Sequence, residues 1–522
     1  MRRLALKQNR MSTVGKNDQA WTWIIVAAAL VARIVISDQF LLAPDEANYW
    51  QWSRYLALSY HDHPPMIAWL IWLSTTIFGH QEWAVRLPTV LGLSVTSIFL
   101  SMLAVHWFSW RVALHTTLVL QALLLTNGAA LIATPDGLLI PCWAAACYFA
   151  ARAIDENRAC FWLLTGCCFG IGLLTKYTMV LFPLSLLLAL LVSEKRKLLL
   201  EKWPWLGFGL GCLFFAPVVI WNAQHDWVTF RHVLYQGGAN EGTRITLKFL
   251  GDYLGSQALL LTPLVFILIL AAWCMPALWQ RIGRGKATFL VCLSLPGFVV
   301  FLLLSLHVRI YGNWPAPVYC TAVLLAAALF GPGKEKLRPG KLWQASMACA
   351  MLLTVPVLAQ AVYPVLPLPL KVDRTARELG GWDQLGIDMG RIAQAMPRPE
   401  QTFLFGLRYQ YASELAYYVP GQPRSVSINQ WTRPNVYDFW YQDADLLGKD
   451  AVGVAQSKDQ AERLGVLFSK SDPVHTINRT RFSPWFGKEV VEVLYVFKGY
   501  GFKGGLRWQA KEKGDIRASS FP

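Results

Sequence analysis

The chain has 522 residues, of which 55% are hydrophobic and only 15% are charged, and its net charge is +16. Soluble globular proteins carry about 25% charged residues, so this composition excludes an ordinary soluble domain. Long apolar runs such as 21–36 and 289–306 approach or reach the length that crosses about 30 Å of hydrocarbon. The sequence therefore predicts a polytopic membrane protein.

About eleven apolar segments are expected to span the membrane. The first residues are polar and basic, and no small-residue cleavage pattern follows before Asp45, so the first apolar segment is interpreted as a retained span and not as a removed signal peptide. The segment 66–79 is shorter and follows polar residues, which favours a helix lying at the membrane interface. The expected spans are 19–42, 84–106, 112–127, 132–152, 161–176, 178–193, 205–221, 254–278, 287–306, 315–331 and 343–363.

The basic residues are divided unevenly between the two sides that these segments define. Lys and Arg gather in cytoplasmic loops of membrane proteins, so the N-terminal tail, 1–18, is placed in the cytoplasm. The split is then 19 inner against 6 outer residues, which explains the positive net charge without a nucleic-acid-binding surface. The inner residues are Arg2, Arg3, Lys7, Arg10, Lys16, Arg111, Arg152, Arg158, Lys195, Arg196, Lys197, Lys202, Arg281, Arg284, Lys286, Lys334, Lys336, Arg338 and Lys341, and the outer ones are Arg54, Lys176, Arg231, Arg244, Lys248 and Arg309.

The composition changes after the last apolar segment. Pro364, Pro367 and Pro369 form a stiff exit from it. The remaining residues, 364–522, alternate short apolar runs with turn-rich polar stretches, a pattern that predicts a mixed α/β domain on the outer side. All ten cysteines precede residue 350, so no disulfide framework is expected in this domain, and their spacing matches no zinc site.

Asp45 and Glu46 directly follow the first span, at the outer boundary of the membrane. A carboxylate there is placed to accept a proton from an acceptor hydroxyl or to hold a metal ion. The alternative is a helix N-cap, because Pro44 and Asp45 together are typical of a helix start.

The densest polar cluster is His61-Asp62-His63, which stands before two prolines in the same outer loop. Two imidazoles and a carboxylate suit a divalent ion or a phosphate group. Adjacent residues rarely all face one ion, so a metal site made of these three residues alone is disfavoured.

Further polar residues fall on the outer side of later spans. Asp136 either pairs with the first-loop carboxylates or only caps a helix. Lys176 either grips a lipid phosphate or only extends its ammonium group to the interface. Arg231 and Arg309 are candidates for phosphate binding, with tryptophans nearby that are also typical of an interfacial belt.

In combination and in this order, the motifs resemble a known family. They are Asp-Glu-Ala-x-Tyr-Trp, Tyr-His-Asp-His-Pro-Pro, Ala-Thr-Pro-Asp, Thr-Lys-Tyr, Trp-Asn-x-Gln-His-x-Trp and Asn-Trp-Pro-Ala-Pro. Over about residues 20–330 they resemble the bacterial protein-mannosyltransferase-like integral membrane glycosyltransferases of the GT-C fold. The stretch from Arg408 to Trp440 is similar to the tail of some members.

The resemblance implies a mainly α membrane protein with a catalytic unit over 19–363, a first periplasmic loop over 44–83 and a periplasmic domain over 364–522. It implies that Asp45 is the general base or positions the acceptor, and that Asp62 belongs to a metal or phosphate site. The expected catalytic residues are Asp45, Glu46 and Asp136; the expected substrate- and phosphate-binding residues are His63, Lys176, Tyr177, Arg231, Arg309 and Asn313; and the expected ligands of a divalent ion (Mg, Mn or Zn) are Asp62 and His61.

The implied function is transfer, with inversion, of a sugar from a polyprenyl-phosphate donor to an envelope acceptor at the periplasmic face of a bacterial inner membrane. Lipid A or another glycolipid is the first acceptor class and a protein, as in O-mannosylation, the second. In the aminoarabinose-transferring branch the loop reads Tyr-Phe-Glu-Lys-Pro-Pro, whereas here Asp62 and His63 replace Glu and Lys; the Asp-His form resembles rhizobial-type enzymes that add galacturonic acid to lipid A. The alternatives are a transporter or flippase of such lipids and a non-catalytic assembly subunit.

Overall fold

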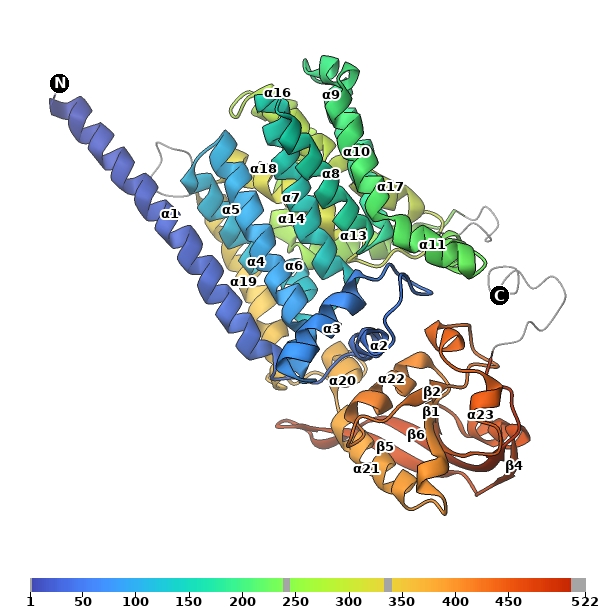
Figure 1. Ribbon diagram of the computed structural model, residues 1–522. Helices are drawn as coiled ribbons and strands as arrows, with labels where there is room; N and C mark the ends of the chain where they lie inside the picture. The colour runs from blue at the N-terminus through green and yellow to red at the C-terminus, as the bar shows by residue number, and fades with distance from the viewer. Residues whose placement is uncertain (1, 238–244, 333–339, 508–522) are drawn as a thin grey trace.

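The computed structural model describes residues 2–237, 245–332 and 340–507, with side chains described from residue 15 onward. Four basic residues used for the topology lie outside these ranges, namely Arg244, Lys334, Lys336 and Arg338. Figure 1 shows two units, a bundle of long helices and a smaller domain built around a β-sheet at one end of the bundle.

The helical unit follows the apolar segments of the sequence. Proline stands in the first turn of several helices, where its missing N–H is no loss. The helices are α1 (Arg2–Ser37), α2 (Pro44–Ser53), α3 (Met66–Phe78), α4 (Glu82–Trp107), α5 (Trp110–Ala122), α6 (Leu124–Leu131), α7 (Pro135–Glu156), α8 (Ala159–Leu173), α9 (Leu181–Leu191), α10 (Lys202–Phe214), α11 (Ala216–Gln224), α12 (Val228–Gln236), α13 (Leu247–Leu260), α14 (Pro263–Cys274), α15 (Pro276–Trp279), α16 (Arg284–Cys292), α17 (Leu295–Leu304), α18 (Tyr319–Phe330) and α19 (Lys341–Val362), with short 3-10 helices η1 (Tyr177–Val180), η2 (Arg196–Leu200) and η3 (Ala316–Val318).

The helical membrane unit is confirmed, but the count of about eleven spans is not. Within the described ranges, 5 helical segments are long and apolar enough to cross a membrane, or up to 8 if each bent pair is one span. The pairs bend by 67° between α5 and α6, 41° between α10 and α11, and 107° between α13 and α14. Hydropathy reveals that a run is apolar but not that its helix bends. A count of apolar runs therefore overestimates the number of straight membrane-spanning helices.

The domain after α19 is the expected mixed α/β domain. Its sheet has the strand order β2-β1-β3-β6-β4, with β5 paired to β6; β1, β2 and β3 are parallel, and β6 is antiparallel to β3, β4 and β5. The elements are α20 (Arg374–Leu379), α21 (Trp382–Gln394), η4 (Pro399–Gln401), β1 (Thr402–Gly406), α22 (Tyr409–Tyr418), β2 (Ser425–Ser427), η5 (Val436–Phe439), η6 (Asp443–Asp445), β3 (Asp450–Ala455), α23 (Lys458–Arg463), η7 (Leu464–Leu467), β4 (Phe468–Ser471), β5 (His475–Ser483) and β6 (Gly487–Phe502).

The two units meet through α2 and α22, which lie against each other (Figure 1). A shared apolar cluster contains Trp50 and Trp52 from the first loop and Ala412 and Ala416 from α22. Buried aromatic side chains dominate interface energetics, so this cluster fixes the domain beneath the first loop.

A fully buried ion pair holds the start of α2 in place. Glu46 and Arg86 are both 0% exposed, and two guanidinium nitrogens of Arg86 donate to the carboxylate at 2.8 and 2.7 Å. The Arg86 guanidinium also donates to the carbonyl oxygens of Ser37, Phe40 and Leu41 at 2.6–2.8 Å. One side chain on α4 therefore fixes the whole turn between α1 and α2.

Removal of the Glu46 carboxylate should destabilise the protein strongly. Glu46→Ala leaves a buried unpaired guanidinium, which typically costs about 3–5 kcal/mol. The thermal unfolding midpoint of the purified protein in detergent measures the loss. The control is Glu462→Ala, which breaks an exposed ion pair with Lys458 and should shift the midpoint far less. Equal shifts for both variants would contradict the structural role of Glu46.

Candidate active site

Asp45 lies in the first turn of α2 and is solvent-accessible. Its Oδ1 accepts a hydrogen bond from the Tyr409 hydroxyl at 3.2 Å. Partial desolvation by the groups packed around it raises the pKa of the Asp45 carboxyl; the Tyr409 hydrogen bond opposes this, and the charge of Asp62 adds to it. A carboxylate with a raised pKa is more basic than usual and suited to accept a proton.

The helix start does not use Asp45 as its cap. The backbone N–H of Ala43 donates to Oε2 of Glu46 at 2.9 Å, so the capping contact belongs to Glu46. The sequence groups Glu46 with Asp45 as a catalytic carboxylate, but the structure encloses Glu46 between Arg86 and the backbone N–H of Ala133, which donates to it at 2.8 Å. Asp45 alone of the two faces open space.

A second cluster joins the first loop to α12. Oδ1 of Asp62 lies 3.0 Å from Nδ1 of His61 and 3.0 Å from Nε2 of His232. Both histidines are buried, at 1% and 3% exposure. Burial alone would raise the pKa of Asp62, but the two imidazoles hold it well below its usual range. Asp62 is therefore ionised and fixed.

This cluster is a group that can hold a metal ion. One ligand atom each from His61, Asp62 and His232 lie within 4.8 Å of one another. Two imidazole nitrogens and one carboxylate oxygen are a common donor set for Zn²⁺, whose bonds of about 2.0–2.2 Å require only small side-chain movements here. The group matches the expected ligands His61 and Asp62 and adds His232. His232 lies far along the chain from Asp62, and only the fold brings the two side chains together.

Asp136, Lys176 and Asn313 form a third group. The Lys176 ammonium donates to both carboxylate oxygens of Asp136 at 2.7 and 2.8 Å, and Nδ2 of Asn313 donates to Oδ2 at 2.7 Å. Lys176 and Asp136 are 6% and 2% exposed. The structure thus brings together three expected site residues, with the charge of Lys176 largely balanced by Asp136.

His63 lies between these groups. Burial, together with the charge of Lys176, lowers the pKa of His63 to about 3, so its imidazole is neutral. Nδ1 of His63 is buried and has no hydrogen-bond partner among the residues that the structure describes. A neutral ring with an open nitrogen can donate a hydrogen bond to a ligand.

The remaining expected residues lie apart from the buried groups. Arg231, on α12, and Arg309 are exposed, and the Arg309 guanidinium lies 5.9 Å from the ring centre of Tyr311. Tyr177 begins η1, and its ring packs against Phe215 and Phe230 at centroid distances of 6.0 and 5.8 Å. The structure does not bring either arginine to Asp45.

Two residues of the C-terminal domain reach the site although the sequence gave them no role. Besides the Tyr409 contact to Asp45, the Arg433 guanidinium lies 5.1 Å from the ring centre of Tyr409. Burial alone would lower the pKa of Arg433, but the charges of Asp62 and Asp45 raise it. The similarity of 408–440 to the tail of some family members was the signal that pointed to this stretch.

A membrane-spanning helical unit with an acidic first loop, covered at one end by a mixed α/β domain, is the GT-C architecture. The family model described as "Dolichyl-phosphate-mannose-protein mannosyltransferase" matches residues 62–221, which confirms the resemblance expected from the motifs. The crystal structure of ArnT from Cupriavidus metallidurans bound to undecaprenyl phosphate shares the fold, with a TM-score of 0.58, 18% identity and coverage of 92% of this chain and 98% of that chain.

Curated relatives match at the sequence level. Lipid A galacturonosyltransferase RgtD of Rhizobium johnstonii is 25% identical over 292 residues, which are 55% of this chain and 60% of that protein. Undecaprenyl phosphate-alpha-4-amino-4-deoxy-L-arabinose arabinosyl transferase of Erwinia tasmaniensis is 30% identical over 223 residues, 38% of this chain and 39% of that protein. The alignments thus span 60% or less of the length of these relatives.

The His61–Asp62–His232 group predicts a bound divalent ion. We expect the purified protein, dialysed against buffer containing Zn²⁺ and then against metal-free buffer, to retain zinc in elemental analysis by plasma mass spectrometry. His232→Ala should lose most of it, because a ligand is removed, whereas His475→Ala, an exposed histidine on β5, should not. Equal zinc content in all three proteins would rule out the site.

Proposed function

We propose that this protein is an inverting glycosyltransferase that moves a sugar from a polyprenyl-phosphate donor to an envelope acceptor at the outer face of a bacterial inner membrane. The observation that carries the proposal is Asp45, an accessible carboxylate of raised pKa beside a group of metal-ligating side chains at the outer end of the spans. The curated relatives carry names of lipid A and undecaprenyl-phosphate sugar transferases, which supports the same chemistry.

An apolar groove offers a place for the donor lipid. It has a volume of about 520 Å³ and is lined by side chains of α8, α9, α10 and α12. Its lining includes Trp162 and Leu199 as well as Tyr177 and Phe230. Phe230 follows Thr229, whose hydroxyl donates to the carbonyl oxygen of Tyr60 in the first loop at 3.0 Å, so this part of the lining lies on the side of that loop. Burial of apolar chain in such a groove is favourable at about 25 cal/mol per Å². A prenyl tail in the groove would bring its phosphate to the neighbourhood of His63 and Lys176.

The transfer step follows from the groups at the mouth of the groove. Asp45 accepts the proton of the acceptor hydroxyl as that oxygen attacks the anomeric carbon, and the bond from this carbon to the phosphate oxygen breaks with its electron pair staying on the phosphate. The transition state has oxocarbenium character. His63 donates a hydrogen bond to the departing phosphate, and a divalent ion, when bound at Asp62, supplies positive charge near it.

The Asp136–Lys176 pair has a positioning role in this scheme. Because Asp136 balances the ammonium charge and Asn313 fixes the carboxylate, Lys176 is held rigidly beside His63. Rigid placement of donors before the reaction is what makes electrostatic stabilisation effective. Arg231 and Arg309, which are exposed, are left for contacts with lipid or acceptor phosphates at the surface.

The acceptor is proposed to be lipid A or another glycolipid, with a protein as the second candidate. Asp62 and His63 stand where the aminoarabinose branch has Glu and Lys, so the sugar is proposed to differ from aminoarabinose. The rival function, a lipid transporter, places its ionisable groups near mid-membrane on broken helices. Here Asp45 stands in the first turn of α2, and α2 lies at the end of the helical bundle that faces the C-terminal domain (Figure 1).

Asp45→Asn should abolish transfer while leaving donor binding intact. The amide cannot take the acceptor proton, and loss of a general base typically lowers the rate by about 10²–10⁴-fold. Transfer is measured by mass spectrometry of lipid A and envelope glycans from cells that carry each variant in place of the native gene. The control is Asp38→Asn, an exposed outer carboxylate that lies before α2.

A transporter predicts a different result from the same pair of variants. In cells, its donor lipid would accumulate on the inner side when transport is blocked. In proteoliposomes supplied with donor on the outer face, the purified transporter would form no glycosylated product, with or without the Asp45 substitution. Normal transfer by Asp45→Asn in such proteoliposomes would refute the assigned role of Asp45.

The rate of transfer should fall at acidic pH as the Asp45 carboxyl becomes protonated. Its pKa is raised, so the basic form is lost as the pH falls through a value above the ordinary range for Asp. Tyr409→Phe removes a hydrogen bond that lowers this pKa, and the acidic limb of the rate profile should then move to higher pH. Asp62, Glu378 and Arg433 are the other charged groups that act on Asp45, and none of them is changed.

The matched control for this profile is Tyr411→Phe. Tyr411 lies on the same helix but donates to Glu492 at 2.6 Å, away from Asp45. An acidic limb that stays in place in Tyr409→Phe, or that moves equally in both variants, would argue against Asp45 as the titrating base.

A further inference from the structure

We propose that the tip of the hairpin formed by β5 and β6 is an interfacial anchor that inserts into the headgroup region of the outer leaflet and docks the C-terminal domain on the membrane. The aromatic tip is defined as Phe482, Trp485 and Phe486. This role is separate from the transfer chemistry and requires only that the helical unit spans the membrane.

The aromatic tip is unusually apolar for a turn that faces water. Phe482, Trp485 and Phe486 are 65%, 56% and 51% exposed. Hairpin turns are normally made of Gly, Asn, Asp, Pro and Ser, and contiguous exposed apolar side chains mark an interaction site. The tip therefore has a partner that accepts aromatic rings.

A hydrogen bond sets the depth of the tip relative to a membrane span. Nε1 of Trp485 donates to the carbonyl oxygen of Val365 at 3.2 Å, and Val365 follows the last residue of α19, Val362, by three positions. A chain advances at most about 3.3–3.6 Å per residue, so Val365 lies within about 10–11 Å of the end of α19, and the indole nitrogen lies one hydrogen bond beyond its carbonyl oxygen. The headgroup layer is about 5–7 Å thick on each side.

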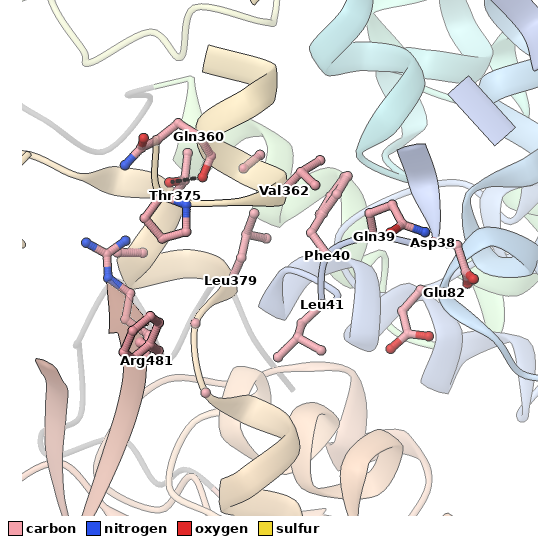
Figure 2. Close-up of a pocket in the computed structure, with 16 residues that line it drawn as sticks. Asp38, Gln39, Phe40, Leu41, Glu82, Gln360, Val362, Thr375, Leu379 and Arg481 are labelled. Carbon is pink, nitrogen blue, oxygen red and sulfur yellow. Dashed lines mark hydrogen bonds between the residues drawn. The ribbon is translucent and has the colours of Figure 1, made fainter. Parts of the chain in front are cut away.

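A pocket gives a second, independent measure of depth. Its volume is about 280 Å³, and it is lined by the segment that follows α1, by the last turn of α19, and by Arg481 and Phe482 of β5. Figure 2 shows Asp38, Gln39 and Phe40 on one side of it and Val362, Gln360 and Arg481 on the other. The hairpin thus lies level with the ends of two spans.

The hairpin is tied to α19 by buried polar contacts. Nε2 of Gln360, in the last turn of α19, donates to Oδ2 of Asp373 at 2.7 Å, and the Arg481 guanidinium donates to the same oxygen at 2.7 Å. Arg481 also pairs with Glu489 on β6 at 3.0 Å. These contacts hold the turn end of the hairpin, next to the aromatic tip, in a fixed position relative to α19.

Lipid fits this surface better than a protein. In the membrane-crossing windows of α1 and α19, the spans beside the tip, only 22% of the residues are buried, so these helices face outward to lipid. Trp is enriched at the membrane–water interface, and Phe is typical of the apolar faces that segments lying in the interface bury in lipid. Lys488, which pairs with Phe482 across the hairpin, is exposed beside the tip and suits an anionic phospholipid headgroup.

The test is photocrosslinking of the full chain in nanodiscs of phosphatidylethanolamine and phosphatidylglycerol. p-Benzoylphenylalanine replaces Phe486 in one protein and Val466 in the control. Val466 is 64% exposed but lies beside β4, which pairs with the opposite end of β6. After irradiation, peptide mass spectrometry should show the mass of one phospholipid added at position 486 and none at 466.

Each of the other outcomes contradicts the proposal that the aromatic tip is a membrane anchor. Unmodified probe at both positions would mean that the tip faces water, and equal lipid addition at both would mean non-specific contact. A cross-link from position 486 to a second copy, or to another protein when the same variant is irradiated in cell membranes, would make the tip a protein-binding surface instead.

Discussion

The buried ion pair of Glu46 and Arg86 is the constraint on which the site depends. Arg86, on α4, binds the Glu46 carboxylate and three carbonyl oxygens of the turn that leads from α1 to α2. Without a partner, either charge would be expensive to bury, so the turn has one stable arrangement. That arrangement places Asp45, one residue before Glu46, at the end of the bundle that faces the C-terminal domain.

Both units contribute residues to the site, and its three aspartates have different surroundings. Asp62 is held ionised by two imidazoles, Asp136 is bound to Lys176, and Asp45 has a raised pKa and an exposed side chain. Two carboxylates whose environments push their pKa values apart are a general sign of divided roles. The C-terminal domain completes the arrangement, because Tyr409 and Arg433 act directly on Asp45 and Asp62.

Composition and motif order predicted the helical unit, the C-terminal domain and most of the candidate site residues. The bends in the helices and the contacts between residues far apart in the chain became visible only in the three-dimensional structure. Hydropathy predicted the helical unit, and the alternation of short apolar runs with turn-rich stretches over 364–522 predicted the mixed α/β domain, because burial imposes those patterns locally. Hydropathy could not reveal the bends that reduce the number of straight spans. The sequence also could not separate Asp45 from Glu46, because only the distant Arg86 distinguishes them. His232 and Arg433 lie far along the chain from Asp62, and no local pattern joins them.

The central claim is that a polyprenyl phosphate reaches Asp45 from the apolar groove beside α8, α9 and α10. The most direct measurement is a cryo-electron microscopy structure of the full chain in nanodiscs with bound polyprenyl phosphate. The account predicts a prenyl tail against Phe169 and Phe208 and a phosphate group within hydrogen-bond distance of His63, next to Asp45. Density for the lipid against α1 and α19, or a phosphate at the opposite end of the groove, would contradict it.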